Sequence, residues 1–288
     1  MVTDEQLIDL IPQWRGRVRG VTALGGGLTN RNLRVELDDG SFVLRVAGKD
    51  TGLLGIDRAV EAACAQRAAQ LGIGPEPLAF LPEHEVLVRR FISGCVLTAA
   101  EVRSPEILGR VVASLRRYHE SAAGPGSFSP FVTVRQYGAL ARERGVELPV
   151  EFGLALEQLA ALEKELGETE TPCPCHNDLL SANLIDDGTV VRIIDWEYAG
   201  MGNRFFDLGN LAVNNEFGEE EETMLLRLYF GAARPADLRR LRLMRLASDM
   251  REAAWGYVQA AISSLNEDFH GYGLKHLHRF LKRAKGGK

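Results

Sequence analysis

The sequence lacks long apolar segments and a strong excess of either charge. No stretch of its 288 residues approaches the roughly 20 apolar residues that a membrane-spanning helix needs. Residues 1–10 carry three acids and have no basic-then-apolar signal layout, so we expect a cytoplasmic protein with no membrane partner. The formal net charge of -5 gives no field suited to nucleic acid, and we expect no nucleic-acid partner. With 45% hydrophobic residues, the chain can still form an ordered core.

Cysteine is also scarce, and two common motifs are missing. Four cysteines are too few to require a disulfide framework in a chain of this length. The run Cys173-Pro-Cys175-His176 is not a C-x-x-C pair and no second ligand pair follows it, which disfavours structural zinc. No G-x-x-x-x-G-K-[ST] sequence is present, so a P-loop enzyme is excluded by motif.

The first third of the chain is typical of a small antiparallel sheet. Apolar and polar residues alternate over 33–37 and 42–46, and Asp39-Gly40 between them predicts a tight hairpin. Residues 57–71 have the pattern of a helix that ends at glycine. Two further strands are expected, one around 78–81 and one around 85–91.

The rest of the chain has the spacing of helices. Apolar periodicity predicts helices near 107–121, 152–166, 219–230, 236–264 and 274–284, interrupted by strands near 183–185 and 190–194. We therefore predict an α+β chain in two lobes. A small antiparallel-sheet lobe would span 1–92 and bind nucleotide, and a larger helical lobe would span 93–288 and carry catalysis and substrate binding.

The strongest chemical signal is an ordered set of acids and amides. The segment His176-Asn177-Asp178-Leu-Leu-Ser-Ala-Asn183 is followed by an apolar strand that ends at Asp195. Asn183 and Asp195 offer the hard oxygen ligands that Mg²⁺ prefers beside phosphates. Asp178 is placed to accept the proton of an attacking hydroxyl, which is what phosphoryl transfer requires. A turn that is merely rich in Asp and Asn is the alternative, and one such residue alone would not exclude it.

These segments resemble a known family. The order H-N-D-x-x-x-x-N followed by I-I-D is similar to the kinase-like phosphotransferases, and three longer runs closely resemble bacterial choline and ethanolamine kinases: residues 176–184, 194–203 and 206–212. The likeness covers about residues 24–281. It implies a protein-kinase-like fold, ATP and Mg²⁺ as cofactors, and a small amino alcohol as substrate, with choline the leading candidate. Aminoglycoside kinases share the skeleton but typically have glycine in place of Asn177.

Upstream segments fit a nucleotide site in the same resemblance. Glycines let a backbone approach phosphates closely, and the loop that would do so holds Gly25, Gly26, Gly27, Thr29 and Asn30. Taken alone, this loop is more typical of a plain hairpin. The resemblance places Arg45 where protein kinases carry the phosphate-binding lysine, and a guanidinium can hold phosphate oxygens bidentately. Glu61 in the following helix is its expected ion-pair partner, although a solvated helix acid is the alternative.

The acceptor is expected to be small. Protein kinases carry a long segment after the metal-binding Asp that closes with A-P-E. Here Asp207 follows Asp195 closely and no such motif appears, so a protein substrate is not expected. The resemblance implies that Asp207 is structural and supports the catalytic loop.

The expected ammonium site is aromatic and acidic. A quaternary ammonium cannot donate hydrogen bonds and needs aromatic faces. The resemblance places Tyr198, Glu216 and Trp255 at the substrate ammonium, and Tyr257 follows Trp255 by two positions in the sequence as a further candidate. Core packing is the alternative for each aromatic residue. Eukaryotic relatives carry a second Trp where Val258 stands, so ethanolamine, thiamine or another amino alcohol stays open.

Two rival functions also stay open. One is a non-catalytic nucleotide-binding module on the same fold, although the base and both metal ligands are all present here. The other is an enzyme that acts on antibiotics or sugars, which would favour a more acidic acceptor site.

Overall fold

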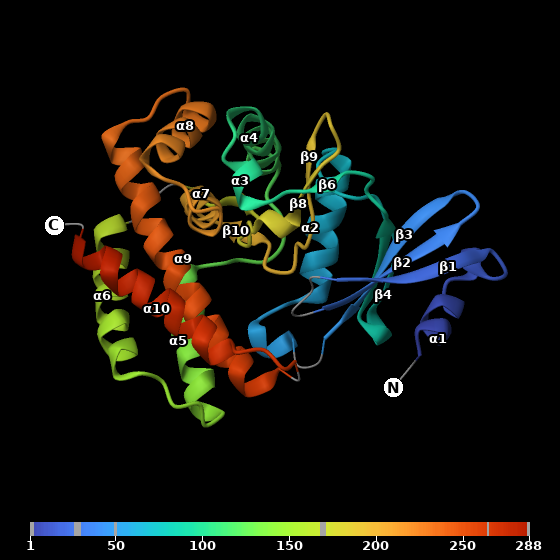
Figure 1. The fold of residues 1–288 in the computed structure, drawn as a ribbon, viewed down its shortest axis with the longest axis horizontal. Coiled ribbons are helices and arrows are strands. Elements are labelled where there is room, and N and C mark those ends of the chain that lie inside the picture. The colour runs from blue at the N-terminus through green and yellow to red at the C-terminus, as the bar shows by residue number, and fades with distance from the viewer. Residues whose placement is uncertain (1–2, 26–29, 49–50, 168–170, 264, 287–288) are drawn as a thin grey trace.

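The computed structural model describes residues 3–25, 30–48, 51–167, 171–263 and 265–286. Its N-terminal part is built on a five-stranded antiparallel sheet in the order β1-β2-β3-β5-β4, seen on the right of Figure 1. The strands are β1 (Val18–Leu24), β2 (Asn30–Leu37), β3 (Gly40–Ala47), β4 (Pro77–Leu81) and β5 (Val86–Arg90). This confirms the sheet that the sequence predicts.

The hairpin between β2 and β3 has the expected register, with Leu37 paired to Gly40. Its apolar face packs against the N-terminal helix α1 (Asp4–Asp9) and the short helix η1 (Pro12–Trp14), and the rings of Trp14 and Phe42 lie 5.6 Å apart. Because side chains alternate along a strand, Arg45 projects from the opposite face of β3. The helix α2 lies on that side.

The helix α2 (Arg58–Gln70) begins where Asp57 accepts hydrogen bonds from Ala59 N (2.9 Å) and Val60 N (3.2 Å). These bonds satisfy two of the free N–H groups at a helix start. The helix ends before Gly72, which has a φ of +68° that favours glycine. Because α2 starts at this fixed position, Glu61 in its first turn faces Arg45.

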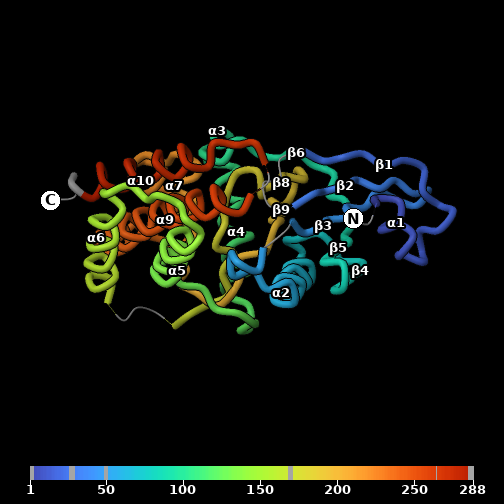
Figure 2. Tube along the Cα trace, turned by 90° about the horizontal axis from the view of Figure 1, so that it is seen from below, coloured from blue at the N-terminus to red at the C-terminus, as the bar shows by residue number. Residues whose placement is uncertain are grey.

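The C-terminal part is helical, as predicted, and the long helix α9 (Pro235–Ile262) lies between α5, α7 and α10 (Figures 1 and 2). The helices in this part are α3 (Ala99–Val102), α4 (Pro105–His119), α5 (Pro130–Glu143), α6 (Val150–Leu166), α7 (Arg204–Asn214), α8 (Glu219–Phe230), α9 and α10 (Phe269–Gly286). Of these, α3, α5 and α7 were not predicted from periodicity. A Cβ at Gly256 would lie 2.8 Å from Gly273 N, so glycine at 256 permits α9 and α10 to pack closely.

Short strands lie at the junction of the two parts. β6 (Cys95–Val96) pairs with β8 (Leu184–Asp186), and β8 pairs with β9 (Val191–Ile193). β7 (Cys173–Cys175) pairs with β10 (Gly200–Gly202). The predicted catalytic segment 176–183 therefore lies between β7 and β8, and Asp195 follows the end of β9. The division of the chain at residues 92 and 93 stays a prediction.

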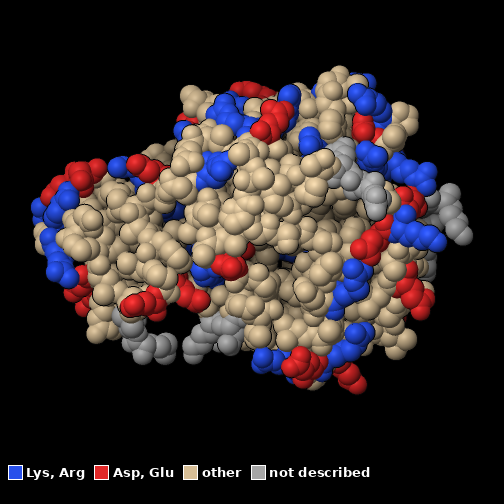
Figure 3. Space-filling model, turned by 180° about the vertical axis from the view of Figure 1, so that it is seen from behind, with Lys and Arg blue, Asp and Glu red and all other residues tan. Residues whose placement is uncertain are grey.

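The surface carries mixed charge. On the face shown in Figure 3, basic and acidic side chains are mixed around the rim, and the middle is largely uncharged except for a few charged groups beside a hollow. No described helix combines the length and apolarity needed to cross a membrane. All four cysteines are free thiols.

Candidate active site

Asp207, the buried acid in the first turn of α7, holds the loop that begins at His176. One Asp207 carboxylate oxygen accepts a hydrogen bond from His176 N at 2.8 Å, and the other accepts from Asn177 N at 2.6 Å. The ring of His119 also contacts this carboxylate, with Nε2 at 2.9 Å from Oδ2. Asn177 has a φ of 67°, a conformation that is costly without such support. Asp207 thus supports the loop, as the resemblance implies.

His176 connects this loop to the strand that leads to Asp195. Its Nδ1 accepts a hydrogen bond from Asp178 N at 3.2 Å, so the proton is on Nε2, which donates to Ile194 O at 2.9 Å. Burial lowers the pKa of His176 below its usual value, so the ring is neutral at pH 7. Its role is to hold the backbone before Asp178 and Asp195 in place.

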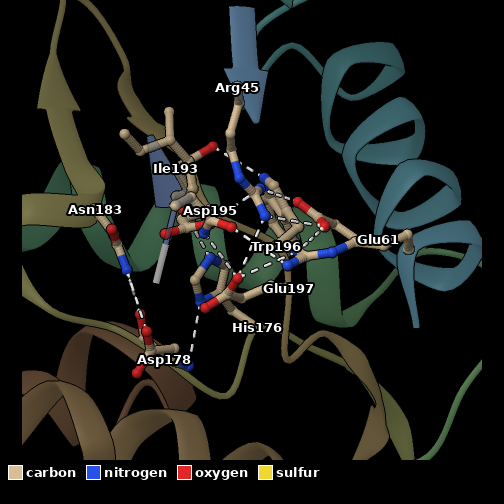
Figure 4. Close-up of polar contacts among 12 residues, drawn as sticks. Arg45, Glu61, His176, Asp178, Asn183, Ile193, Asp195, Trp196 and Glu197 are labelled. Carbon is tan, nitrogen blue, oxygen red and sulfur yellow. Dashed lines mark hydrogen bonds and ion pairs between the residues drawn. The ribbon is translucent and has the colours of Figure 1, made fainter. Parts of the chain in front are cut away.

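Asp178, Asn183 and Asp195 lie together on one side of the cluster in Figure 4. Asn183 Nδ2 donates to Asp178 O at 2.9 Å, and this leaves its amide oxygen directed away from Asp178. Ile194 N donates to Asn183 O at 3.0 Å, which fixes Asn183 beside the residue that precedes Asp195. The three predicted residues are therefore neighbours.

Burial raises the pKa of Asp178 to about 7, although Arg251 beside it acts to lower that pKa. The negative charges of Glu252, Asp195 and Glu197 add to the rise. A carboxylate with a pKa near the working pH is suited to accept and release a proton. The environment of Asp178 thus fits a general base.

The oxygen atoms at Asn183 and Asp195 fit a magnesium ion. Asp195 Oδ1 is buried and accepts no hydrogen bond from the described residues, although Arg45 Nη1 lies 3.1 Å from it as an ion pair. An amide oxygen and a carboxylate are hard ligands of the kind Mg²⁺ takes beside phosphates. Asp195 has a φ of 66°, and backbone strain of this kind concentrates at functional sites.

A second group of metal-binding residue types, His119, Cys175 and Asp207, lies buried behind the catalytic loop. Both nitrogens of His119 already have hydrogen-bond partners, Tyr229 and Asp207, and the Asp207 carboxylate binds the loop backbone. This group therefore serves as a hydrogen-bonded support.

Arg45 forms the positive centre of the site, and its side chain is only 3% exposed. It pairs with Glu61 through both ends of its guanidinium and lies 3.3 Å from Glu197 and 3.1 Å from Asp195. Burial alone would lower the pKa of Arg45, but these three carboxylates raise it above its usual value. The predicted pairing of Arg45 with Glu61 is present, and the guanidinium stays charged.

Three contributors to this cluster were not predicted in their present roles. Glu197 accepts from Asn30 Nδ2 at 2.9 Å and lies 3.3 Å from Arg58 Nη1. Arg58 also contacts Glu61 at 2.7 Å. The Trp-Glu-Tyr-Ala run that carries the resemblance includes Glu197, so the sequence draws attention to this residue. It does not indicate that Glu197 contacts Asn30 and Arg58. Arg89 lies on the same face of the sheet, and burial together with Arg45 lowers its pKa to about 10.

The glycine segment is described only at its two ends. Gly25 follows β1, and a Cβ there would meet no atom of the described part of the chain within 4 Å. Asn30 begins β2 and is buried. Gly26, Gly27 and Thr29 lie outside the described residues, so their predicted part in nucleotide binding stays a prediction.

Two of the predicted acceptor residues lie in direct contact. Trp255 Nε1 donates to Tyr198 Oη at 3.1 Å, and the two side chains come from α9 and from the segment after β9. Both residues are largely buried, at 7% and 8% exposed. Tyr272 of α10 lies edge-on to Trp255 at 5.6 Å and was not predicted. An aromatic group therefore borders the site.

The other two predicted acceptor residues lie elsewhere. Tyr257 is fully buried and packs against Phe152 and His270. It follows Trp255 by two positions, which on a helix turns it to the far side of α9. Glu216 has a side chain that is 76% exposed and pairs with Arg103 at 3.7 Å. The structure does not bring either residue to the Tyr198–Trp255 pair.

Arg251 connects the aromatic pair to Asp178. Its Nη1 donates to Asp178 Oδ1 at 3.0 Å, and its guanidinium carbon lies 4.3 Å from the centre of the Tyr198 ring. The same nitrogen contacts Glu252, which accepts from Tyr272 Oη at 2.8 Å. Arg251 precedes Trp255 by four positions, so a helix places both on the same face. This spacing is the sequence feature that could have indicated Arg251 as a member of the acceptor site.

The N-terminal part holds a buried Arg–Glu pair, and the helical part brings together a carboxylate suited to a base and two oxygen groups suited to a metal ion. Phosphoryl transfer depends on positioning and charge of this kind. Protein-kinase-like phosphotransferases that act on small molecules are the class that this fold and site define.

Comparison with known proteins identifies the family. The model of the "Phosphotransferase enzyme family" matches residues 20–244. The solved structure of a choline/ethanolamine kinase family protein from Mesorhizobium loti superposes with a TM-score of 0.85 at 31% identity, covering 98% of this chain and 95% of that one. The chain therefore belongs to the phosphotransferase enzyme family and, within it, stands with the choline and ethanolamine kinases.

Other relatives agree with this placement. Ethanolamine kinase 2 of Rattus norvegicus is 29% identical over 95% of this chain and 78% of its own length. The protein LicA of Haemophilus influenzae is 25% identical over 89% of this chain and 78% of its own length. The fold of choline kinase LicA from Streptococcus pneumoniae matches with a TM-score of 0.83 at 22% identity, covering 98% of this chain and 99% of that one. The predicted two-lobed, protein-kinase-like fold is confirmed, and the chain is a small-molecule kinase.

Proposed function

We propose that this kinase transfers the γ-phosphoryl group of ATP to the hydroxyl of a small amino alcohol, with choline and ethanolamine as the leading acceptors. The observation that carries the proposal is the contact of Arg251 with both Asp178 and Tyr198, since it joins the base to the aromatic site. An acceptor beside Tyr198 would thus have its hydroxyl within reach of the carboxylate that takes its proton.

In the proposed reaction, the acceptor oxygen forms a bond to the γ-phosphorus while the bond from that phosphorus to the bridging oxygen of ADP breaks. Asp178 accepts the proton that leaves the hydroxyl. Arg45, held by Glu61 and Glu197, binds phosphate oxygens. Asn183 and Asp195 would hold Mg²⁺, which supplies charge neutralisation at the phosphates when bound. Most of the rate enhancement comes from alignment and charge stabilisation.

The relatives support the acceptor class and the use of a nucleotide. Proteins similar to this chain are named ethanolamine kinase and choline kinase. LicA has been solved with AMP, and a spectinomycin phosphotransferase of the same fold has been solved with ADP and spectinomycin. An aminoglycoside-type acceptor is the less favoured alternative, because the acceptor site here has an aromatic pair. Use of ATP also fits the cytoplasmic location expected from the sequence.

A panel of acceptors tests the proposal. ADP release is measured with choline, ethanolamine, thiamine, an aminoglycoside and a sugar alcohol, each at several concentrations with ATP and Mg²⁺. We expect turnover that depends on an amino alcohol and is lost in Asp178→Asn, while nucleotide titration of that variant stays near normal. Near wild-type turnover in Asp178→Asn would refute the base assignment. Turnover with a sugar alcohol or an aminoglycoside alone would refute the acceptor class.

A further inference from the structure

Arg251 is a fixed cation inside the proposed acceptor site. Its side chain is 2% exposed, and three groups surround the guanidinium: the Asp178 carboxylate, the Glu252 carboxylate and the face of the Tyr198 ring. Glu252 is in turn held by Tyr272, and Tyr198 by Trp255. The position of Arg251 is thus set by residues from α9, α10, the catalytic loop and the segment after β9.

The guanidinium occupies the position, at the Tyr198 face and beside two carboxylates, where the attraction for a substrate cation would be strongest. A cation is attracted to an aromatic face when it lies within about 6 Å of the ring centre, and Arg251 already occupies the Tyr198 face at 4.3 Å. Arg251 also neutralises one of the two carboxylates that it contacts. A second cation that enters the site meets both a filled ring face and a like charge.

We propose that Arg251 is a specificity-determining residue that disfavours trimethylammonium acceptors and favours amino alcohols with a primary ammonium group. The inference rests on the proposed function and deepens it by naming the class of amine. A trimethylammonium group has no N–H and is bulky, so it depends on open aromatic faces. A primary ammonium is compact and donates up to three hydrogen bonds.

The oxygen atoms in this network are suited to a primary ammonium. Glu252 and Asp178 provide carboxylate oxygens, and Tyr198 provides a phenol oxygen that already accepts from Trp255. Hydrogen bonds from an ammonium to such oxygens offset its repulsion from Arg251, and they are charge-assisted. The same repulsion acts on a trimethylammonium group, which is attracted by the remaining carboxylate but cannot form those hydrogen bonds.

The test compares kcat/KM for ethanolamine and for choline in the intact protein and in Arg251→Ala. We expect the wild-type protein to favour ethanolamine by at least about tenfold. In Arg251→Ala, the exposed Tyr198 face and the lost positive charge should raise the choline-to-ethanolamine ratio at least about tenfold. Because loss of Arg251 leaves the buried Glu252 without its cationic partner, the double variant Arg251→Ala/Glu252→Gln is measured in parallel, and thermal unfolding checks that both variants fold.

Arg245 provides a matched control. It is a largely buried arginine on the same helix, and it pairs with Glu222 away from the acceptor site. Arg245→Ala should reduce stability but leave the choline-to-ethanolamine ratio unchanged. A similar change in both variants would show that the ratio responds to general disruption of α9, and it would overturn the inference.

The outcomes separate the two levels of the proposal. Wild-type turnover that favours choline, or an unchanged ratio in the folded Arg251 variants, overturns the role of Arg251 while the amino-alcohol kinase function stands. If the wild-type protein phosphorylates no amino alcohol, the proposed function fails and the inference fails with it. If neither Arg251 variant folds, the ratio of kcat/KM for ethanolamine and choline in the wild-type protein still tests the inference.

Discussion

The Asn30 side chain donates a hydrogen bond to Glu197 Oε2 at 2.9 Å and joins two positions that are 167 residues apart in the sequence. Asn30 begins β2 in the small lobe, and Glu197 lies two positions after Asp195 in the helical part. Arg58 and Arg45 contact the same Glu197 oxygen, each at 3.3 Å. One buried carboxylate therefore connects the end of the glycine segment, α2 and β3 to the proposed metal site.

Loss of this bond is expected to weaken nucleotide binding. Asn30→Ala removes the donor to Glu197, so the β2 end of the glycine segment loses its attachment to the helical part. We expect the KM for ATP to rise about tenfold, equivalent to about 1.4 kcal/mol, with little change in the KM for the amine. Asn32→Ala on the same strand is the control. Equal effects of the two substitutions on the KM for ATP would contradict the role of the Asn30–Glu197 bond.

The rate should fall on the acidic side of neutrality. The pKa of Asp178 is raised to about 7 by burial, with Arg251 opposing and Glu252, Asp195 and Glu197 adding to the rise. A base works only when deprotonated, so kcat/KM for the amine should drop about tenfold per pH unit below that value. A profile measured between pH 5 and 9 at saturating nucleotide checks this. An acid limb near pH 4, as for an ordinary exposed carboxyl, would contradict it.

Asp207 is expected to hold the catalytic loop in its strained conformation. In Asp207→Asn, one carboxylate oxygen becomes an NH₂ group that faces a buried backbone N–H, either that of His176 or that of Asn177. Leaving such donors unpaired, and removing the charge that His119 contacts, should cost about 3 kcal/mol of unfolding free energy. Urea denaturation measures this cost, and kcat should fall as well. Asp9→Asn, at an exposed position of α1, should change neither quantity.

The two tyrosines of the predicted acceptor site should behave differently. Tyr198→Phe removes the oxygen that Trp255 Nε1 contacts at 3.1 Å and should raise the KM for the amine several-fold. Tyr257→Phe removes a buried hydroxyl that has no hydrogen-bond partner among the residues the structure describes, so it should leave that KM unchanged and should not lower the melting temperature. Steady-state kinetics and thermal unfolding of both variants are the measurements. A rise in the KM for the amine in Tyr257→Phe would restore Tyr257 to the acceptor site.

Much of the fold was predictable because its signals are local. The β2–β3 hairpin follows from alternation and an Asp-Gly turn, and α2 follows from its Asp57 cap and its terminal glycine. Helices α5 and α7 were not predicted. α7 is buried over most of its length, so the polar face that makes a helix visible in a sequence is nearly absent there.

The candidate site was predictable only in part. Asp178, Asn183 and Asp195 stand in one ordered motif, and the structure brings them together. Tyr257 and Trp255 are close in the sequence, but the turn of α9 directs them to opposite sides. Arg251 belongs to no recognised motif, and its place in the site is evident only from its contacts with Asp178 and Tyr198.

The sequence alone determined the alternation that forms the sheet, the ordered acids and amides of the catalytic loop, and the likeness to a kinase family, because these depend on the order of neighbouring residues. The tertiary structure alone decided which charges share a buried space. Arg45, Glu61 and Glu197 come from three separate elements, as do Asp178, Tyr198 and Arg251. Burial makes such contacts strong since little water screens them, and only the packing of distant segments brings the groups into that environment.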